Sequence, residues 1–135
     1  MVVAFRAGYL RGMSSPDFSP IEVGGKKDGF RITGTPQAAL RIEAWGYWPP
    51  DVAAAFARDA QAAVQKLAAT AMFTLDATNL KPQGAEGQEA LRSVLRVLSL
   101  LAFARGMVVA SNIMTSMQIA RLLRECKLED RVVIE

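Results

Sequence analysis

The order in which strand-type and helix-type patterns follow one another constrains the fold of this chain most. Residues 40–48 alternate apolar and polar side chains with period two, which is typical of a β-strand. A shorter apolar run at residues 30–33 precedes them, and a Gly-Thr-Pro turn at residues 34–37 separates the two runs. Two strands joined by so short a turn pair in an antiparallel manner. We therefore expect a sheet that opens with a β-hairpin.

After this hairpin, helix patterns and short apolar runs alternate to the end of the chain. The helix patterns cover residues 50–69, 85–104 and 115–127, and the apolar runs of strand length cover residues 71–76, 107–111 and 131–134. Strands that alternate with helices predict a central, partly parallel sheet. We expect one α/β domain at residues 26–135, with a mixed four- to five-stranded sheet packed by three helices. Residues 1–25 are interpreted as an N-terminal tail or an added strand.

Local signals refine the helices. Pro49, Pro50 and Asp51 suit the start of the first helix, because proline fits the first turn and an acid is favoured there. Thr115 with Gln118 three residues later predicts a capping box for the third helix. That helix is expected to bury Met117 together with its regular apolar stripe.

Two apolar features leave a choice between core and surface. Val97 and Leu100 widen the apolar face of the helix at residues 85–104, and we favour core packing over a dimer or partner surface. Cys126 follows the apolar stripe of the last helix, so it is interpreted as a small buried residue and not as a reactive thiol.

The residue types that are missing narrow the function. The chain has no histidine and one cysteine, so it lacks the residues for Ser-His-Asp catalysis, for the usual zinc sites and for an internal disulfide. No pair of acidic residues has a spacing that suggests a catalytic site. We expect a cytoplasmic protein that is not an enzyme and holds no cofactor and no metal.

Charge and hydropathy argue against two kinds of partner. The formal net charge is +3, and the basic residues are spread along the chain, so nucleic-acid binding is not expected. The longest apolar region, residues 94–113, is interrupted by two arginines, a glycine and an asparagine and cannot supply about 20 apolar residues in a row. We therefore expect no membrane partner either.

Several short segments, in their order, carry a resemblance to a known family. They are Arg-Ile-Glu-Ala-Trp-Gly at residues 41–46, Phe-Thr-Leu-Asp-Ala-Thr-Asn-Leu at residues 73–80, Gly87, and the strand and helix at residues 107–111 and 115–127. In this order, residues 30–135 resemble the STAS domain of anti-sigma factor antagonists and sulfate transporters. The resemblance implies a non-catalytic regulatory domain whose partner is a Ser/Thr kinase-like anti-sigma factor or another STAS protein. A homodimer is a further alternative.

The chain departs from this family at one position that matters. Regulatory members carry Asp-Ser-Ser-Gly at the start of a helix, and the hydroxyl just before the glycine is phosphorylated. Here the corresponding residues are Gly84-Ala85-Glu86-Gly87, so Glu86 takes the place of the phosphoacceptor serine. A carboxylate is a permanent negative charge that is weaker than a phosphate, and it is also simply favourable at a helix start.

The resemblance implies a contact surface in two neighbouring loops. The predicted partner-binding residues are Asp76, Thr78, Asn79, Gly84, Glu86, Gly87, Asn112 and Thr115. Trp45 and Trp48 are candidate interface aromatics, since tryptophan is enriched at binding hot spots. Trp45 is expected either on an open sheet face or beneath residues 1–25.

Two other functions stay open. Asp76 closes the apolar run at residues 71–76, so a receiver-like or flavodoxin-like domain with Asp76 as phosphoacceptor is one alternative, although the carboxylate can also serve only the following loop. A small-ligand or anion-binding domain is the other, because residues 84–87 lie at an expected helix N-terminus.

Overall fold

The structure of the protein is a computed structural model that describes residues 19–135. Of the expected tail or added strand at residues 1–25, residues 1–18 lie outside this range. The structure contains a six-stranded sheet and three helices, which confirms the α/β class with more strands than expected. In chain order the elements are β1 (Ile21–Gly24), β2 (Gly29–Thr35), β3 (Ala39–Gly46), α1 (Pro50–Val64), β4 (Met72–Leu80), α2 (Ala85–Ser99), β5 (Arg105–Val109), α3 (Ile113–Glu125) and β6 (Val132–Ile134).

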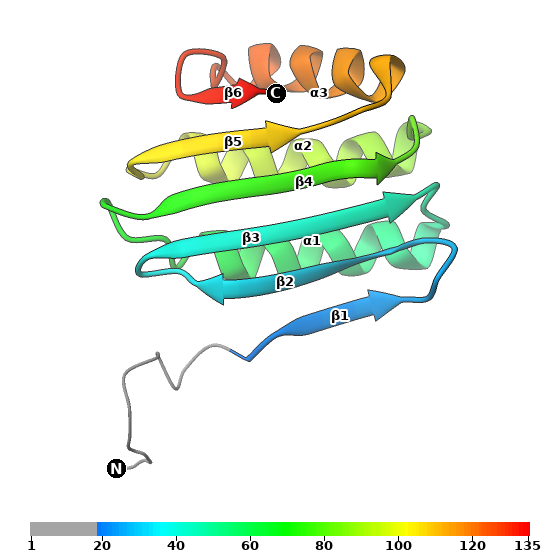
Figure 1. Cartoon of the computed structure of the whole chain (residues 1–135), viewed down its shortest axis with the longest axis horizontal. Coiled ribbons are helices and arrows are strands. Elements are labelled where there is room, and N and C mark those ends of the chain that lie inside the picture. Colours follow the sequence, from blue (N-terminus) through cyan, green and yellow to red (C-terminus); the bar gives the residue numbers. More distant parts are fainter. Residues whose placement is uncertain (1–18) are drawn as a thin grey trace.

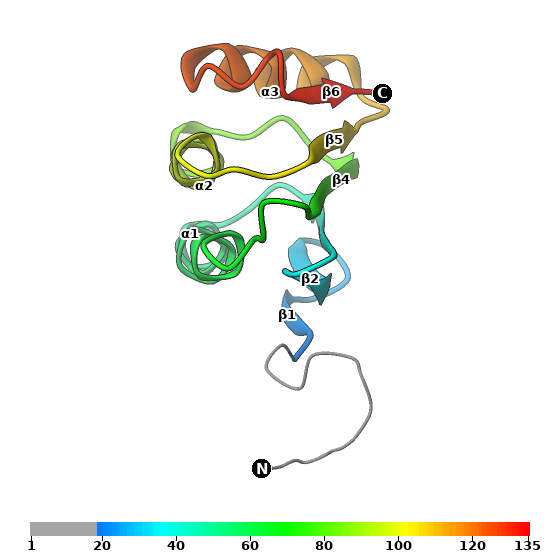
Figure 2. The same ribbon diagram turned by 90° about the vertical axis from the view of Figure 1, so that its left-hand side faces the viewer.

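The six strands lie side by side in the order in which they occur in the chain. β2 and β3 form the predicted antiparallel hairpin, and β1 pairs with the outer edge of β2. From β3 to β6 all pairs are parallel. Because every parallel connection is a right-handed crossover to the next strand, all three helices lie on the same face of the sheet (Figures 1 and 2).

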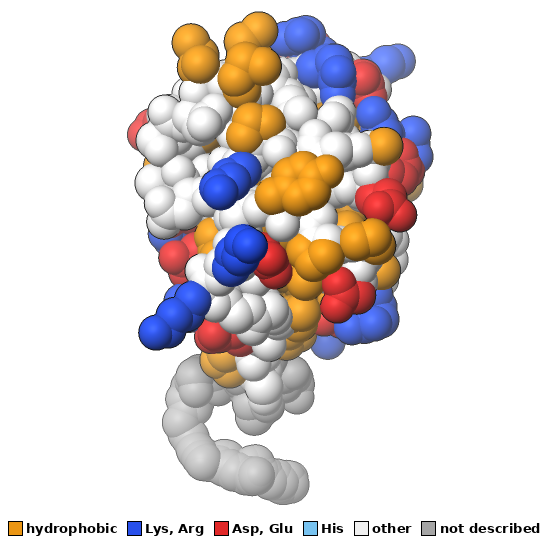
Figure 3. Space-filling view, turned by 90° about the vertical axis from the view of Figure 1, so that its right-hand side faces the viewer, with side chains coloured by type: hydrophobic (Ala, Val, Ile, Leu, Met, Phe, Trp, Pro, Cys, Tyr) orange, Lys and Arg blue, Asp and Glu red, His pale blue; other side chains and the backbone are white. Residues whose placement is uncertain are grey.

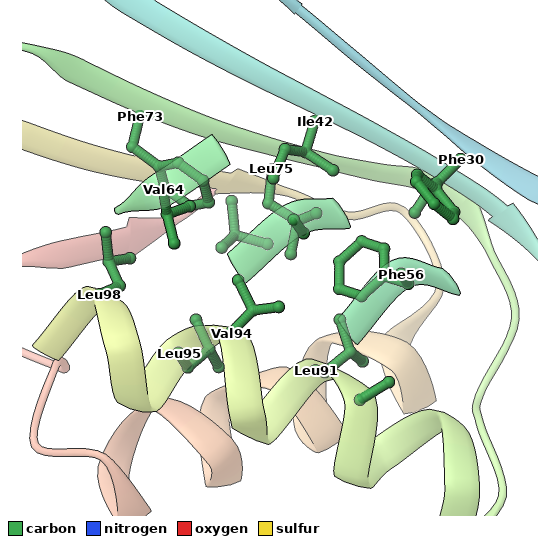
Figure 4. Packing of buried hydrophobic residues seen from close by; sticks show 14 of the residues in the cluster. Phe30, Ile42, Phe56, Val64, Phe73, Leu75, Leu91, Val94, Leu95 and Leu98 are labelled. Atoms are coloured by element: carbon green, nitrogen blue, oxygen red, sulfur yellow. The ribbon is translucent and has the colours of Figure 1, made fainter. Parts of the chain in front are cut away.

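The core fills the space between the sheet and this single layer of helices. Figure 4 shows Phe30, Ile42, Phe73 and Leu75 of the strands pointing toward the helices. Their helical partners are fully or nearly fully buried and include Phe56, Val64, Leu91, Val94, Leu95 and Leu98. Because side chains alternate along a strand, one set of side chains of β3 points into the core and the other set points to the opposite side of the sheet.

Trp48 belongs to this core, so its prediction as an interface aromatic is wrong. Its side chain is only 3% exposed, and its ring lies 4.5 Å from the Phe56 ring and 6.4 Å from the Phe30 ring between centroids. The indole N–H donates a hydrogen bond to the Gly29 carbonyl at 3.1 Å. Trp48 lies beyond the end of β3, where strand alternation no longer decides which way a side chain points.

No described helix covers the other face of the sheet (Figure 2). Arg31 pairs there with Glu22 at 2.9 Å and with Glu43 at 3.0 Å. Trp45 lies on this open face, which was one of the two predicted positions for it, and its side chain is half-buried. Its indole N–H donates a hydrogen bond to the Gly25 carbonyl at 2.7 Å. This face is therefore polar and internally paired over β1 to β3.

The ends of several elements differ from the sequence predictions. α1 and α2 end at Val64 and Ser99, five residues earlier than expected, while β4 continues to Leu80. Val97 packs against the core as predicted, but Leu100 follows the end of α2 and is 86% exposed. Met117 is 61% exposed, so its predicted burial is wrong: it lies on the outer side of α3, away from the stripe of Ile119 and Leu122. Within residues 19–135, no helix has both the length and the hydropathy to span a membrane.

Candidate functional site

The carboxyl ends of β3 and β4 lead into the starts of α1 and α2, and β5 leads into α3 at the same edge of the sheet. Figure 3 looks onto this edge, where exposed hydrophobic side chains gather toward the α3 end of the molecule. In open α/β sheets the carboxyl edge of the parallel strands is the usual place for a binding site. The loops at this edge therefore form the candidate site.

Gln83 holds the loop between β4 and α2 in place, a role that the sequence analysis did not predict. It is 4% exposed. Its side-chain nitrogen donates to the carbonyls of Gly46 at 2.9 Å and Lys81 at 2.8 Å, and its side-chain oxygen accepts from the N–H of Trp48 at 3.1 Å. Both polar groups of this side chain are thereby used, and they join the loop before α1 to the loop before α2. The only signal in the sequence is a glutamine between a proline and a glycine, which does not distinguish a buried side chain from a solvated one.

The same loop is tied to α3. The Gln83 N–H donates to the side-chain oxygen of Gln118 at 2.8 Å, and the Gln118 amide donates back to the Gln83 carbonyl at 3.0 Å. The hydroxyl of Ser111 donates to the Thr78 carbonyl at 2.8 Å. The two loops that the resemblance implied as one surface are thus brought together.

The predicted cap of α3 was Thr115, but the structure gives this role to Asn112 and buries Thr115. Asn112 is the N-cap of α3, and its side-chain oxygen accepts from the N–H groups of Met114 at 2.8 Å and Thr115 at 3.1 Å. Thr115 is 1% exposed and its hydroxyl donates to the Leu80 carbonyl at 2.8 Å. The predicted capping box at Thr115 is therefore wrong, and Thr115 cannot touch a partner because it is used to anchor α3 to β4.

The start of α2 lies where the sequence placed it. The helix begins at Ala85 with Gly84 as N-cap, and Glu86 in the first turn is exposed. Gly87 is buried against Gln83, and a Cβ there would lie 2.4 Å from the Gln83 side-chain oxygen. A Cβ on Gly84 would meet the Tyr47 hydroxyl at 2.4 Å. Of this stretch, Glu86 and Ala85 are the residues that a partner can reach, while both glycines allow close packing.

The prediction that Asp76 ends its strand is wrong, because Asp76 lies within β4. A register shift between β3 and β4 pairs Glu43 with Asp76 but Trp45 with Asn79, so β4 continues past an irregularity at Ala77 and Thr78. Asp76 points to the open sheet face, forms an ion pair with Arg41 and accepts from the Thr78 N–H at 3.0 Å and its hydroxyl at 2.6 Å. The structure therefore separates Asp76 from the exposed start of α2.

The electrostatics of Asp76 follow from these contacts. Partial burial raises the pKa of the carboxyl, but the hydrogen bonds from Thr78 and the charge of Arg41 together outweigh it and hold the pKa below its ordinary value. The carboxylate is thus a charged, structurally engaged group at neutral pH.

Three exposed apolar side chains at the start of α3 form a candidate contact surface that the sequence analysis did not predict. Ile113, Met114 and Met117 are 74%, 56% and 61% exposed, and we call them the α3 patch. Their spacing of three and four residues puts them side by side on one helix face. Arg121 and Arg124 continue on the exposed side of the helix. The signal was present in the sequence, because residues 113, 114 and 117 fall outside the core stripe of Thr115, Ile119, Leu122 and Leu123.

Asn79 lines a different feature. A shallow hollow of about 490 Å³ on the open face is bordered by Asn79, Trp45, Arg31, Lys26 and Glu43, among others. Arg31 in this hollow is already bound to Glu22 and Glu43. The hollow therefore offers few free polar groups that converge on a ligand.

The remaining chemistry of the described residues is sparse. Cys126 is 9% exposed, and burial raises the pKa of its thiol, so it fits the inert residue that the sequence predicted. Residues 19–135 hold no cluster of three or more histidine, cysteine, aspartate or glutamate side chains that is arranged to bind a metal ion.

Comparison with known proteins gives no relative for this chain: no family model matches it, and neither a curated protein nor a solved structure shows significant similarity.

Proposed function

We propose that this protein is a non-catalytic, cytoplasmic regulatory domain that binds a protein partner, in the manner of an anti-sigma factor antagonist of the STAS type. The observation that carries the proposal is the α3 patch at the start of α3, together with the exposed Glu86 at the start of α2; both helix starts lie at the carboxyl edge of the parallel strands. Exposed apolar side chains that cluster at one edge are typical of a protein contact surface. Candidate partners are a Ser/Thr kinase-like anti-sigma factor and another STAS protein.

The rigidity of this edge supports a binding role. Gln83 and Gln118 join the loop before α2 to α3, and Thr115 anchors the first turn of α3 to β4. The α3 patch and Glu86 are therefore presented on a fixed scaffold, and a partner does not have to order them. Preorganised surfaces bind with a smaller loss of conformational entropy.

Glu86 is the residue from which we infer how the binding of the partner is regulated. It lies in the first turn of α2. The resemblance to the STAS family equates this position with the hydroxyl that is phosphorylated there. A fixed carboxylate there makes a surface that does not change with phosphorylation. In this proposal the protein stays in one binding state, and control of the pathway lies with the partner.

The two alternative functions find less support. Receiver chemistry needs a phosphoacceptor at the carboxyl end of a strand, whereas Asp76 lies inside β4 and is bound to Arg41 and Thr78. A ligand-binding role would use the hollow beside Trp45, whose arginine is already paired with two glutamates.

The test is affinity capture from the source cells with matched baits. The wild-type protein, Met114→Asp and Glu86→Lys are compared with the control Leu100→Asp, whose exposed side chain lies at the opposite end of α2. We expect a partner that the wild type and L100D retain and that M114D and E86K lose. A partner retained equally by all four baits, or no partner at all, would contradict the proposal and direct the work to ligand screening.

A further inference from the structure

A groove runs between α1 and α2 on the side of the helices that faces away from the sheet. It encloses about 320 Å³ and is lined mainly by alanines, including Ala54, Ala57 and Ala90, with Glu86 and Glu89 on its α2 rim. The small side chains leave room that larger ones would fill. The groove lies along most of α1, from Pro50 to Gln61, and along the amino-terminal half of α2, where its lining spans positions 86 to 93.

The carboxyl-terminal end of α2 presents complementary groups. Leu100 is 86% exposed, more than any other large hydrophobic side chain in the described residues. Arg96, one turn earlier, has an exposed side chain whose contact in its own chain is a loose one of 3.6 Å to Glu89. Of the two glutamates on the groove rim, Glu89 is already paired with Arg92 at 2.5 Å, whereas Glu86 forms no ion pair among the described residues. α2 therefore carries a concave surface with the carboxylate of Glu86 at one end and a basic, apolar projection at the other.

We propose that a second copy of this chain docks on the α1–α2 face with its α2 antiparallel to the first. In this arrangement Leu100 of each copy fills the groove of the other, and Arg96 of each copy faces Glu86 and Glu89 of the other. The two-fold axis crosses α2 near Ser93, because position 93 is midway between Glu86 and Leu100. Both contacts then form twice, as an isologous interface requires.

The dimensions of the helix agree with this arrangement. Glu86 and Leu100 are 14 positions apart in the sequence, which corresponds to about 21 Å along a helix. Antiparallel packing about position 93 brings Leu100 of one copy level with Glu86 of the other, at the amino-terminal end of the groove. Opposite charges then meet along both halves of the helix pair, which fixes its direction.

This inference goes beyond the proposed function, because it names a second surface with a second occupant. The α3 patch lies on the neighbouring helix and takes no part in the α2 pairing. A dimer of this kind leaves Met114 accessible, whereas Glu86 lies on the rim of the groove and takes part in both contacts. The α3 patch and the α2 pairing are therefore tested separately through Met114 and Leu100.

The experiment measures the mass of the full chain in solution by light scattering and sedimentation over a concentration series. We expect a mass of twice 14.6 kDa for the wild type and for the control Met114→Asp. Leu100→Asp, which puts a charge at the centre of the contact, and Ala54→Trp, which fills the groove, are both expected to give 14.6 kDa. Circular dichroism checks that each variant is folded.

Exchange of the charges provides a test that does not depend on the size of the substituted side chain. Glu86→Arg and Arg96→Glu each bring like charges together and are expected to weaken the dimer, whereas the double variant E86R/R96E is expected to restore it. A short bismaleimide reagent should link two copies of Ser93→Cys, while Ser116→Cys on α3 should remain unlinked; both carry Cys126→Ala.

The outcomes are decisive in both directions. A single-chain mass for the wild type at every concentration overturns the inference. So does a dimer that L100D and A54W leave intact, because its interface would then lie elsewhere. Loss of the partner in M114D with the dimer preserved, and loss of the dimer in L100D with the partner preserved, would show that the two surfaces are independent.

Discussion

The side-chain oxygen of Gln83 accepts a hydrogen bond from the backbone N–H of Trp48 at 3.1 Å, which joins the loop before α2 to the loop before α1. The same amide donates to the Gly46 and Lys81 carbonyls. One buried side chain thus bonds to three backbone groups of two loops, and the Gly46 carbonyl also accepts from the Lys81 N–H at 3.2 Å.

Truncation of this side chain should be costly. Gln83→Ala removes the acceptor of the buried Trp48 N–H and the donor to the Lys81 carbonyl, and leaves the Gly46 carbonyl with one donor in place of two, so we expect the free energy of unfolding to fall by about 1–3 kcal/mol. Urea denaturation followed by circular dichroism measures the change. Gln37→Ala, which truncates an exposed glutamine in the β2–β3 turn, is the control and should be nearly neutral. Equal stability of Q83A and Q37A would show that water replaces Gln83 without loss.

Gly87 should resist the substitution that usually strengthens a helix. Replacing glycine by alanine inside a helix ordinarily stabilises it by up to about 1 kcal/mol. At position 87 the new Cβ would lie 2.4 Å from the Gln83 oxygen and 2.8 Å from its Cβ. Because Gln83 is held by its hydrogen bonds, we expect G87A to destabilise the protein by about 1–3 kcal/mol, as overpacking does.

The matched control for G87A is Gly25→Ala in the β1–β2 turn. A Cβ at Gly25 would meet nothing within 4 Å. Thermal unfolding of both variants separates the effect of close packing from the loss of a glycine. A stabilising G87A would mean that Gln83 moves aside freely and does not fix the start of α2.

Asp76 makes stability depend on pH in a predictable direction. Its folded pKa lies below its ordinary value of 3.8, so its contribution to stability is complete above that pH. As the pH falls from about 4 through the folded pKa, the carboxylate takes up a proton and the contribution is lost. We expect the stability difference between wild type and Asp76→Asn to be largest near neutral pH and to shrink with acidification.

Urea denaturation at a series of pH values measures this difference. Asp130→Asn, which removes an exposed carboxylate before β6, controls for the change in net charge. A difference between wild type and D76N that stays constant down to acidic pH would contradict the role assigned to Arg41 and Thr78.

The two tryptophans should differ in their fluorescence. Trp48 is 3% exposed within an aromatic cluster, whereas Trp45 is half-buried on the open sheet face. With Trp45→Phe, the remaining Trp48 should emit at shorter wavelength and be poorly quenched by acrylamide. With Trp48→Phe, the remaining Trp45 should emit at longer wavelength and be quenched more strongly. Similar quenching of both variants would indicate that Trp45 is covered in solution.

The cap of α3 can be assigned by mutation. Asn112→Ala removes the acceptor for the N–H groups of Met114 and Thr115, and we expect a loss of about 1 kcal/mol. Asn79→Ala changes an exposed asparagine in β4 that caps no helix of residues 19–135 and should have little effect. If N112A is also neutral in chemical denaturation, the helix start is held by Thr115 and Gln118 alone.

The sequence by itself determined the class of the fold, because side-chain periodicity is a local property. The alternation at residues 40–48 defined both faces of β3, and the order of strands and helices required a sheet with parallel crossovers. The start of α2 at Ala85 followed from Gly84 and Glu86 in the same local way. Such patterns need no knowledge of distant partners.

Only the tertiary structure decided what each candidate residue does, since that depends on what lies opposite. The pairing of Trp45 with Asn79 carries β4 past Asp76, and the space between β2 and α1 takes up Trp48. The Thr115 hydroxyl donates a hydrogen bond to the Leu80 carbonyl, and Asn112 caps α3 in place of Thr115. Because all crossovers run to the next strand, one layer of helices carries both the α3 patch and the α1–α2 groove, and no local pattern in the sequence contains that arrangement.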